Sequence, residues 1–407
     1  MAQSDLLTIL HISDFHYAKR KHREQEIIVD ALVADLGRVC VGRQRPDLVM
    51  FTGDLVHAAG TDQHDAAYDF LIDRVSKVSG CSDERIFIAP GNHDLSWSGV
   101  EQYGDETNRW RAIIGTDEET PAFNKLFEER AFDKAVAAKF GNYNDLEKFL
   151  NGDPRHNRRV YQSAFVTVDH ISTLNVDIVT FNTAVLSTGG HKSYAKDAGL
   201  LVMPEYAVME AIKSLSADSL RVFVTHHPLA HLSEQSAKYL DGEIARHAHV
   251  HLFGHMHDPQ PKNVTGLKGT VLANQAGALF TARKKYYNGY SLITMKRASM
   301  DAEVIVRSYF PERSEFDEGV DIIEGGKWWS SPEARSLFHK LASPIDPERL
   351  REHLKINALR DLTQAVYPLD PPSAFCDEDA WPSATPLQFN PSRFASFSRA
   401  SRMMTPA

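Results

Sequence analysis

Residues 85–97 of the chain read RIFIAPGNHDLSW, which is a short apolar run followed by Pro-Gly and then by Asn92, His93 and Asp94. The β-branched and aromatic residues before Pro90 predict a buried strand that ends at this turn. An amide, an imidazole and a carboxylate in a row are costly to hold there, because each polar group needs a partner where water is excluded. A bound cation is one candidate for that partner.

The same design recurs along the chain. Further apolar runs that end in glycine or polar residues are LLTILHISD, DLVMFTGD, VDIVTFNT, LRVFVTHHP and HVHLFGHMH. Residues 22–42 and 62–80 carry apolar side chains at helical spacing and end near Gly42 and Gly80, so the chain is expected to open β-α-β-α-β. A helix around residues 204–216 and antiparallel strands in TVLANQAGALF, GYSLITMKR and AEVIVRSYF would complete the core. We therefore predict an α/β fold of two sheets flanked by helices.

Two regions depart from this core pattern. Residues 98–158 are rich in Glu, Lys, Asn and Phe with helical stretches, and they are interpreted as a helical insertion that could cap a cleft. We expect a catalytic domain over residues 1–311 and a C-terminal extension over residues 312–407. The last residues, from about 390, are rich in Ser, Arg and Phe, which predicts a flexible tail. A nucleic-acid or partner contact of this tail is the less favoured interpretation.

The composition favours a cytoplasmic protein that acts on small substrates. The 407 residues carry a net charge of −9, which is unfavourable for indiscriminate binding to nucleic acid or an anionic membrane. No apolar run is long enough to span a bilayer, and the N-terminus lacks the basic start of a secretory signal. The three cysteines Cys40, Cys81 and Cys376 show no CxxC spacing, so we expect reduced, mostly buried thiols.

Residues of metal-ligand type follow five of the predicted strands. Each alone is more typical of a turn or a helix cap. All five nevertheless sit where a strand meets a loop, the edge at which open α/β sheets place their ligands. The candidate ligands are Asp14, His16, Asp54, Asn92, His226, His255 and His257.

The residue types suit a pair of transition-metal ions. A carboxylate such as that of Asp54 can bridge two cations roughly 3.5 to 4 Å apart. Imidazoles favour manganese, iron, zinc or cobalt over the all-oxygen cages of magnesium and calcium. Gly53, Gly91 and Gly254 directly precede candidate ligands, where a missing side chain permits a tight turn or a close backbone approach.

The ordered set Asp14-x-His16, Gly53-Asp54, Gly91-Asn92-His93-Asp94, His226 and Gly254-His255-x-His257 closely resembles the calcineurin-like metallophosphoesterase superfamily. The resemblance covers roughly residues 6–300. The short TGDLV, PGNHD, HHPL and GHMH forms are most similar to the bacterial cyclic-nucleotide and glycerophosphodiester phosphodiesterase class. The resemblance implies a four-layered α/β sandwich with two metals at the strand ends.

The resemblance also implies a role for each residue. Asp14, His16, Asp54 and His257 would hold one metal, and Asp54, Asn92, His226 and His255 the other, with Asp54 as the bridge. His93 would contact the phosphate or donate a proton to the leaving oxygen, and Asp94 would orient its imidazole. Asn92 and His93 are also expected to contact substrate, as is His227 in the cleft.

Three functions remain open from the sequence. The leading hypothesis is a binuclear metal-dependent phosphodiesterase, in which a metal-activated hydroxide attacks a cyclic nucleotide or another small phosphodiester. The first alternative is a DNA or RNA nuclease of the same superfamily, which the acidic charge disfavours. The second is a non-catalytic scaffold that binds partners. A homodimer is possible, and no membrane partner is expected.

Several other residues have more ordinary interpretations. His251 is expected to pack within a sheet, with His247 and His249 on the surface of the same strand. Near the motif segments, substrate contact is one interpretation of His57, His64, His191 and His231, and a solvated loop histidine is the favoured one. Asn182 either touches the cleft or orders its loop by a hydrogen bond. Trp328 and Trp329 are expected to dock the C-terminal region.

Overall fold

The computed structural model describes residues 5–41, 45–58, 60, 62–151, 158–189, 196–266, 269–281 and 288–330. The chain divides into two units, residues 1–343 and 344–407, and all described residues belong to the first unit. The expectations for His191, for Cys376, for the C-terminal extension beyond residue 330 and for the tail lie outside the described residues.

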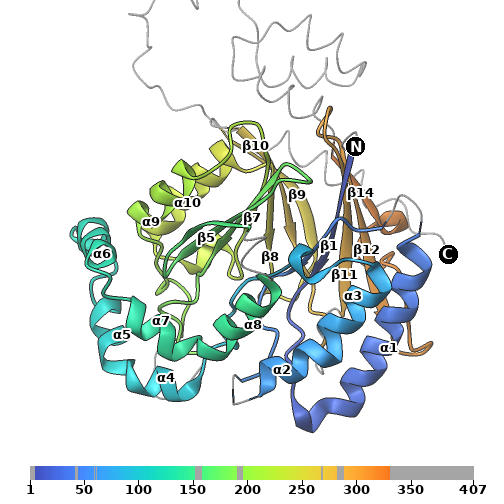
Figure 1. Ribbon diagram of the computed structural model, residues 1–407, viewed down its shortest axis with the longest axis horizontal. Coiled ribbons are helices and arrows are strands. Elements are labelled where there is room, and N and C mark those ends of the chain that lie inside the picture. The colour runs from blue at the N-terminus through green and yellow to red at the C-terminus, as the bar shows by residue number, and fades with distance from the viewer. Residues whose placement is uncertain are drawn as a thin grey trace, which may run out of the picture. The chain divides into compact units, whose positions relative to one another are not determined.

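The first sheet joins three strands from the start of the chain to four from its later part (Figure 1). Its members are β1 (Leu6–Ile12), β2 (Leu48–Phe51), β3 (Ile86–Ile88), β11 (Gly289–Lys296), β12 (Ala302–Phe310), β13 (Glu315–Glu318) and β14 (Lys327–Ser330). The order is β13-β12-β11-β1-β2-β3, and β14 also pairs with β12. β1, β2 and β3 are parallel, whereas β11 runs antiparallel to β1.

Helices make the crossovers between the three parallel strands. α1 (His22–Val39) connects β1 to β2. The next crossover begins with α2 (Gln63–Ala67), passes through a π-helical turn at Tyr68–Ile72 and ends with α3 (Asp73–Ser79). Gly80 stops this helix in the left-handed conformation, with φ of 77° and its N–H bonded to the carbonyl of Ser76. The β-α-β-α-β opening is as expected from the sequence.

The second sheet is also mixed. Its strands are β4 (Arg159–Gln162), β5 (Val166–Ile171), β6 (Val176–Phe181), β7 (Leu220–Val224), β8 (Val250–Phe253), β9 (Gln260–Gly266) and β10 (Gly269–Gln275). They lie in the order β4-β5-β6-β7-β8-β10-β9. β6, β7, β8 and β10 are mutually parallel, and β4, β5 and β9 supply the antiparallel pairings. α9 (Glu205–Lys213) and α10 (Glu234–His247) belong to the crossovers of this sheet.

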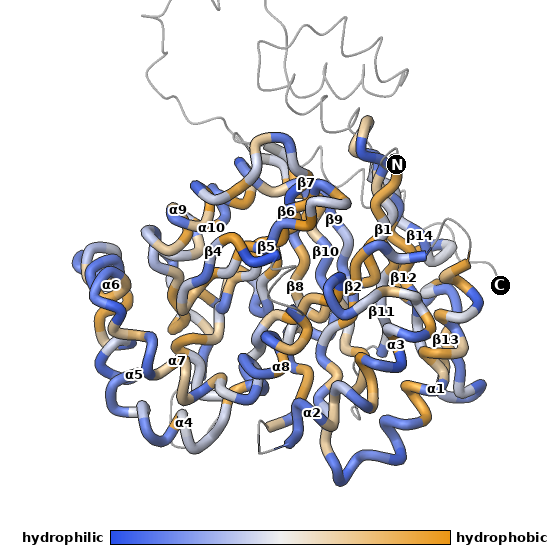
Figure 2. The backbone as a smooth tube through the Cα atoms, viewed as in Figure 1, coloured by the Kyte–Doolittle hydropathy of each residue, from blue (hydrophilic) through white to orange (hydrophobic). Residues whose placement is uncertain are grey.

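The two sheets stack face to face, with helices on their outer faces. In β1, Leu7 and Ile9 face the second sheet, while Leu10 and Ile12 pack in the cluster that contains α1 and α3. The second sheet alternates in the same way, because Ile178 of β6 faces inward and neighbouring residues of β6 pack in the cluster of α9 and α10. Strands buried on both faces are nearly continuously apolar, as the hydrophobic central strands of Figure 2 show. The predicted α/β sandwich is confirmed.

Among the described residues between β3 and β4, five helices form the insertion. They are α4 (Trp97–Gln102), α5 (Gly104–Arg111), α6 (Glu119–Glu128), α7 (Asp133–Lys139) and α8 (Gly141–Asn151). The stretch between α6 and α7 turns at Arg130, which has φ of 57°. Hydrophilic residues are prominent in α5 and α6 in Figure 2, which fits their position at the periphery of the molecule.

A buried lysine ties this insertion to the second sheet. The Nζ atom of Lys139 donates to Thr107 Oγ1 at 3.0 Å, to the carbonyl of Val185 at 3.1 Å and to that of Ser187 at 3.3 Å. Burial lowers the pKa of Lys139 from 10.5 to about 7. Nearby, Arg111 of α5 pairs with Asp197 at 2.5 Å. The insertion and the loop after β6 are therefore joined through buried charged groups.

Some sequence-based expectations need correction. The strand predicted in TVLANQAGALF is β10, which belongs to the second sheet instead of forming one antiparallel set with β11 and β12. His247 ends helix α10 and does not share a strand with His249 and His251, although His251 is buried within β8 as expected. The first sheet also extends past residue 311, because β13 and β14 pair with β12.

Trp328 packs against the core between the sheets, whereas Trp329 is 66% exposed. Cys40 and Cys81 are free and buried. Within the described ranges, no helix has the length and apolar character needed to cross a membrane.

Candidate metal centre

All of the predicted ligands lie just beyond the carboxyl ends of parallel strands. In the first sheet, β1 leads to Asp14 and His16, β2 to Asp54, and β3 to Asn92. In the second sheet, β7 leads to His226, and β8 leads to His255 and His257. Because the carboxyl ends of parallel strands meet at one edge, both sheets deliver side chains to the same place.

The backbone is strained at most of these positions. Asp14, His16, Asp54, His255 and His257 have φ between 51° and 69°, in the left-handed region that costs a non-glycine residue about 1–2 kcal/mol. They account for half of the ten non-glycine residues with positive φ among those the structure describes. Backbone hydrogen bonds from Asp14 to Gly53 (3.0 Å) and from His16 to Asp54 (2.9 Å) hold the first two loops together. Such concentrated strain is typical of functional sites.

The glycines before the ligands are required by close approach. A Cβ atom on Gly91 would lie 2.9 Å from Cγ of Asp54, and one on Gly254 would lie 2.6 Å from Oδ2 of Asp14. Real Cβ atoms essentially never come so close to another heavy atom. The loops of β3 and β8 therefore pack directly against the two carboxylates.

The first group of side chains consists of Asp14, His16 and His257. Nε2 of His257 lies 3.2 Å from Asp14 Oδ1 and 3.3 Å from Nε2 of His16. Nε2 of His16 lies 3.8 Å from the same carboxylate oxygen. Burial would raise the pKa of Asp14, but the hydrogen bond to His257 and the imidazoles of His226 and His257 outweigh it, and the pKa is lowered to about 2. Asp14 is therefore a carboxylate at neutral pH.

The second group surrounds Nε2 of His226. This atom lies 3.1 Å from Oδ1 of Asn92 and 3.2 Å from Nδ1 of His255. Nδ1 of His226 lies 2.7 Å from the carbonyl oxygen of Thr52 and donates to it, so Nε2 is the atom that a metal would bind in place of a proton. Orientation of a ligand imidazole by a backbone carbonyl is typical of metal-binding histidines.

Asp54 lies between the two groups. Its Oδ2 is 3.9 Å from Nε2 of His16 on one side and 3.4 Å from Nε2 of His226 on the other. Its Oδ1 accepts a hydrogen bond of 2.8 Å from the backbone N–H of His93. The carboxylate is 1% exposed, so it is held by the protein and not by solvent.

These residues fit divalent cations. The converging side chains are carboxylates, imidazoles and one amide, which are all potential metal ligands, and Nδ1 of His16 is buried without a hydrogen-bond partner. Asp14, His16 and His257 form one set of potential ligands, and Asp14, Asp54 and His226 form another. Burial disfavours charge on His226, yet Asp54 and Asp14 raise its pKa to about 9. A pocket that attracts a proton so strongly also attracts a cation.

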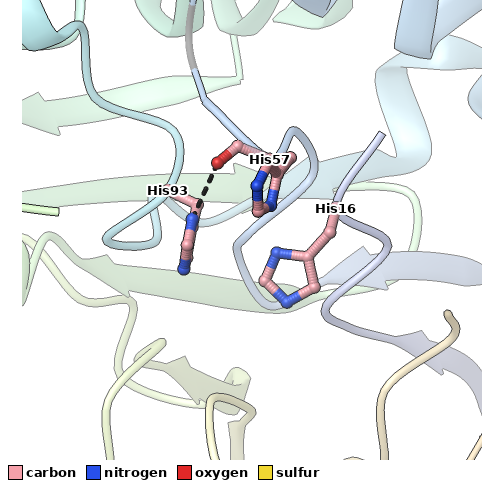
Figure 3. A group of neighbouring side chains, drawn as sticks. All are labelled: His16, His57 and His93. Carbon is pink, nitrogen blue, oxygen red and sulfur yellow. Dashed lines mark hydrogen bonds between the residues drawn. The ribbon is translucent and has the colours of Figure 1, made fainter. Parts of the chain in front are cut away.

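His93 stands beside this cluster and is oriented by an unexpected group. Its Nδ1 donates a hydrogen bond of 2.7 Å to the backbone carbonyl of His57 (Figure 3). The ring of His57 stacks at 5.4 Å from that of His93, and the ring of His16 meets it edge-on at 4.8 Å. The one signal for His57 in the sequence is its position three residues after Asp54.

The expected role of Asp94 is not what the structure shows. The Asp94 carboxylate accepts hydrogen bonds from the backbone N–H groups of Val56 (3.2 Å) and Gly91 (2.9 Å). It also lies 3.5 Å from Nε2 of His64, which is buried instead of solvated. Since none of these partners is the His93 ring, Asp94 connects the loops of β2 and β3, and the carbonyl of His57 orients His93.

His227 is fully buried beside the second group. Its Nδ1 lies 2.9 Å from Thr183 Oγ1, and its ring lies 4.6 Å from that of His255. Nε2 is buried without a hydrogen-bond partner. Burial and the neighbouring imidazoles of His226 and His255 hold the pKa well below its usual value, so the ring is neutral. In the next loop along the sheet, Asn182 accepts a hydrogen bond from the N–H of Ala184, the loop-ordering alternative.

An α/β sandwich with carboxylate, amide and imidazole ligands at the strand ends defines a class of metal-dependent hydrolases. The family model of calcineurin-like phosphoesterases matches residues 7–259 of the chain. The chain therefore belongs to the calcineurin-like phosphoesterase family. A comparison with curated protein sequences finds no match.

The chain is also similar to several solved structures, three of which follow. A predicted phosphoesterase from Streptococcus pneumoniae is 12% identical, with 80% of this chain and 98% of that chain covered and a TM-score of 0.28. GAP50 of Plasmodium, described as an anchor in the inner membrane complex, is 11% identical, with 84% and 95% covered and a TM-score of 0.39. Vps29 from Entamoeba histolytica complexed with Zn²⁺ is 11% identical, with 80% and 99% covered and a TM-score of 0.30. Similarities of this size carry no information about function.

Proposed function

We propose that this protein is a binuclear metal-dependent phosphodiesterase. The observation that carries the proposal is the position of Asp54, whose Oδ2 faces His16 on one side and His226 on the other. A carboxylate between two groups of potential ligands is suited to bridge two cations. Family membership supports a metal-dependent phosphoesterase in general, and the bridge is what favours two metals.

Each metal would have its own ligands in addition to the shared one. Asp14, His16 and His257 would complete the first site with Asp54, and Asn92, His226 and His255 the second. The imidazole content favours manganese, iron, zinc or cobalt. When bound, the two cations supply charge neutralisation of the phosphate oxygens and a water of lowered pKa.

The protein's own residues would perform the remaining steps. Asn92 and His93 would contact the phosphate and so orient the ester for in-line displacement. Nδ1 of His93 is committed to the carbonyl of His57, so Nε2 is the atom that would carry a proton to the leaving oxygen. The carbonyl stabilises the doubly protonated ring that this step requires.

A small phosphodiester is the favoured substrate class. The TGDLV, PGNHD, HHPL and GHMH forms support a relation to bacterial cyclic-nucleotide and glycerophosphodiester phosphodiesterases. The net charge of −9 disfavours long nucleic acids. If the protein were a nuclease, it would cleave nucleic acid. If it were a scaffold, it would bind metal without hydrolysing any ester.

The experiment is hydrolysis of bis(p-nitrophenyl) phosphate by the full chain loaded with Mn²⁺. We expect turnover that Asp54→Asn and His255→Ala abolish, together with about two metal ions per chain by elemental analysis. A panel of cyclic nucleotides, glycerophosphodiesters and single-stranded DNA then identifies the substrate class. Activity that survives both substitutions would contradict the proposal, and preferential cleavage of DNA would favour the nuclease.

A further inference from the structure

We infer that Arg20, beside His57, selects phosphodiesters whose leaving group carries a second negative charge, such as a phosphate or a carboxylate. The inference rests on the proposed function and adds a substrate class to it. It begins from three histidines, His16, His57 and His93, that lie together at one side of the candidate metal centre (Figure 3).

The position of His93 sets the side on which the leaving group departs. Hydrolysis breaks the bond between phosphorus and the leaving oxygen, which takes its proton from Nε2 of His93. The leaving group must therefore lie against the His93 ring. His57 stacks at 5.4 Å on that ring, with 19° between the planes, and is itself exposed. The substituent on the leaving oxygen therefore extends past the side chain of His57.

Arg20 lies beside His57. One of its terminal nitrogens is 3.4 Å from Nε2 of His57 and donates toward it. Arg20 is exposed and belongs to a turn of three basic residues, Lys19–Lys21. Lys21 pairs with Glu24 at 2.9 Å, but no described carboxylate lies within ion-pair distance of Arg20. Its charge is thus available to a substrate.

The histidines are held in place independently of any ligand. The backbone N–H of His57 donates to the carbonyl of Tyr17 at 2.9 Å, and the carbonyl of His57 accepts from His93. On the other side of the loop, Nδ2 of Asn142 donates to the carbonyl of Gly60 at 3.2 Å. Arg20 and His57 therefore project from fixed backbone, one from each of the loops after β1 and β2.

The same three histidines are close enough to suggest a further metal site, but the charges argue for an anion. Arg20 brings a permanent positive charge to His57 and occupies its Nε2. Nδ1 of His93 already donates to a carbonyl, and Nε2 of His16 faces Asp14 and His257. A cation would be repelled there, whereas a carboxylate or phosphate would accept charge-assisted hydrogen bonds from Arg20.

This arrangement distinguishes among small phosphodiesters. In a cyclic nucleotide the leaving oxygen belongs to a neutral sugar, and in glycerophosphocholine one leaving alcohol carries a cation. A diphosphate-linked substrate instead releases a phosphomonoester, whose charge Arg20 can bind. The site thus favours leaving groups that are themselves anionic.

The test uses two esters of the same shape, methyl 4-carboxyphenyl phosphate and methyl 4-carbamoylphenyl phosphate, with the Mn²⁺-loaded full chain. We expect kcat/KM to favour the carboxylate about tenfold, which is the size of one charge-assisted hydrogen bond. Arg20→Ala should bring the ratio to about one, and Arg20→Glu should invert it. Arg23→Ala, which removes an exposed arginine from the following helix, should leave the ratio as in the wild type.

A second readout does not depend on turnover. The dissociation constants of 4-carboxybenzylphosphonate and 4-carbamoylbenzylphosphonate, measured by calorimetry, should show the same preference and the same dependence on Arg20. If the wild type shows no preference, or if Arg20→Ala keeps it, the inference is wrong. If bis(p-nitrophenyl) phosphate is not hydrolysed either, the proposed function fails, and the phosphonates alone decide about Arg20.

Two further substrates distinguish a small diphosphate from a nucleic acid strand as the source of the second negative charge. ADP-ribose releases a phosphomonoester from a diphosphate, and the dinucleotide pTpT represents a nucleic acid strand. We expect Arg20→Ala to lower kcat/KM for ADP-ribose about tenfold relative to bis(p-nitrophenyl) phosphate. A loss confined to pTpT would overturn the assignment to small diphosphate-type substrates.

Discussion

Nδ1 of His93 lies 2.7 Å from the backbone carbonyl oxygen of His57, which follows Asp54 by three residues. The carbonyl fixes the ring orientation without a second titratable group. His93 and Asp54 are also joined directly, since the N–H of His93 donates to Oδ1 of Asp54 at 2.8 Å. The candidate acid and the candidate bridge are therefore parts of one hydrogen-bonded unit.

The role of His93 predicts a dependence on the leaving group. His93→Ala should slow hydrolysis of an alkyl ester about 10²- to 10⁴-fold, because a poor leaving group needs the proton. The p-nitrophenyl ester, which departs without protonation, should lose much less. Steady-state kcat with methyl p-nitrophenyl phosphate and a dialkyl phosphate checks this. Equal losses on both esters would indicate that His93 contacts the phosphate but does not protonate the leaving oxygen.

The role of Asp54 predicts a loss of metal together with activity. Asp54→Asn keeps the shape of the side chain but removes the charge, and we expect activity to fall about a hundredfold or more, with fewer metal ions bound per chain. Elemental analysis and kcat measure the two effects. Asp62→Asn is the matched control, because Asp62 also has a positive φ (66°) but is exposed. Full metal content in Asp54→Asn would contradict the bridging role.

The close approach at Gly91 predicts a steric effect. Gly91→Ala places a methyl group against Asp54 and should lower the free energy of unfolding by about 1–3 kcal/mol, the usual cost of overpacking, and reduce metal content. Gly141→Ala is the control, since a Cβ there meets nothing within 4 Å. Chemical denaturation and elemental analysis report both effects. Wild-type metal content in Gly91→Ala would show that the loop adjusts freely.

The buried Lys139 predicts a pH-dependent stability. Burial lowers its folded-state pKa to about 7, below the unfolded value near 10.4, so the charged form is penalised in the fold. The penalty is complete below pH 7 and is relieved as the pH rises from 7 to 10. Relative to Lys139→Met, the wild type should gain up to about 1.4 kcal/mol per pH unit in this window.

Denaturation of both proteins at pH 7, 8 and 9 measures this difference. Lys134→Met is the control, because Lys134 belongs to the same helix α7 but is exposed. Its difference from the wild type should not change over this range. A constant difference for Lys139→Met as well would mean that Lys139 stays charged in the folded protein.

The sequence correctly predicted the strands that end directly at a motif of candidate ligands. β1, β2, β3, β7 and β8 are apolar runs that end at ligand-type residues, and the structure has each of them. It did not reveal α10, whose polar sequence EQSAKYLDGEIARH shows little beyond its amphipathic spacing. β9 and β14 were also missed, because Pro261 and two adjacent tryptophans obscure the alternation of a strand.

Contacts through the backbone were the least predictable part of the site. Motif spacing placed seven candidate ligands, and the structure brings them together at one edge. The carbonyl of His57 left no trace in the sequence, since any residue carries a carbonyl. Asp94 follows His93 directly, yet the turn aims its carboxylate at the N–H groups of Val56 and Gly91. Adjacency in sequence therefore did not indicate contact.

Four of the candidate ligands come from the first sheet and three from the second, so neither sheet alone carries a complete set. The apolar layer that includes Ile9 and Ile178 sets the spacing between the sheets. The affinity for a metal would therefore depend on apolar side chains that do not contact it. Substitutions that enlarge or reduce the side chains of this layer would change the metal affinity, although every candidate ligand stays the same.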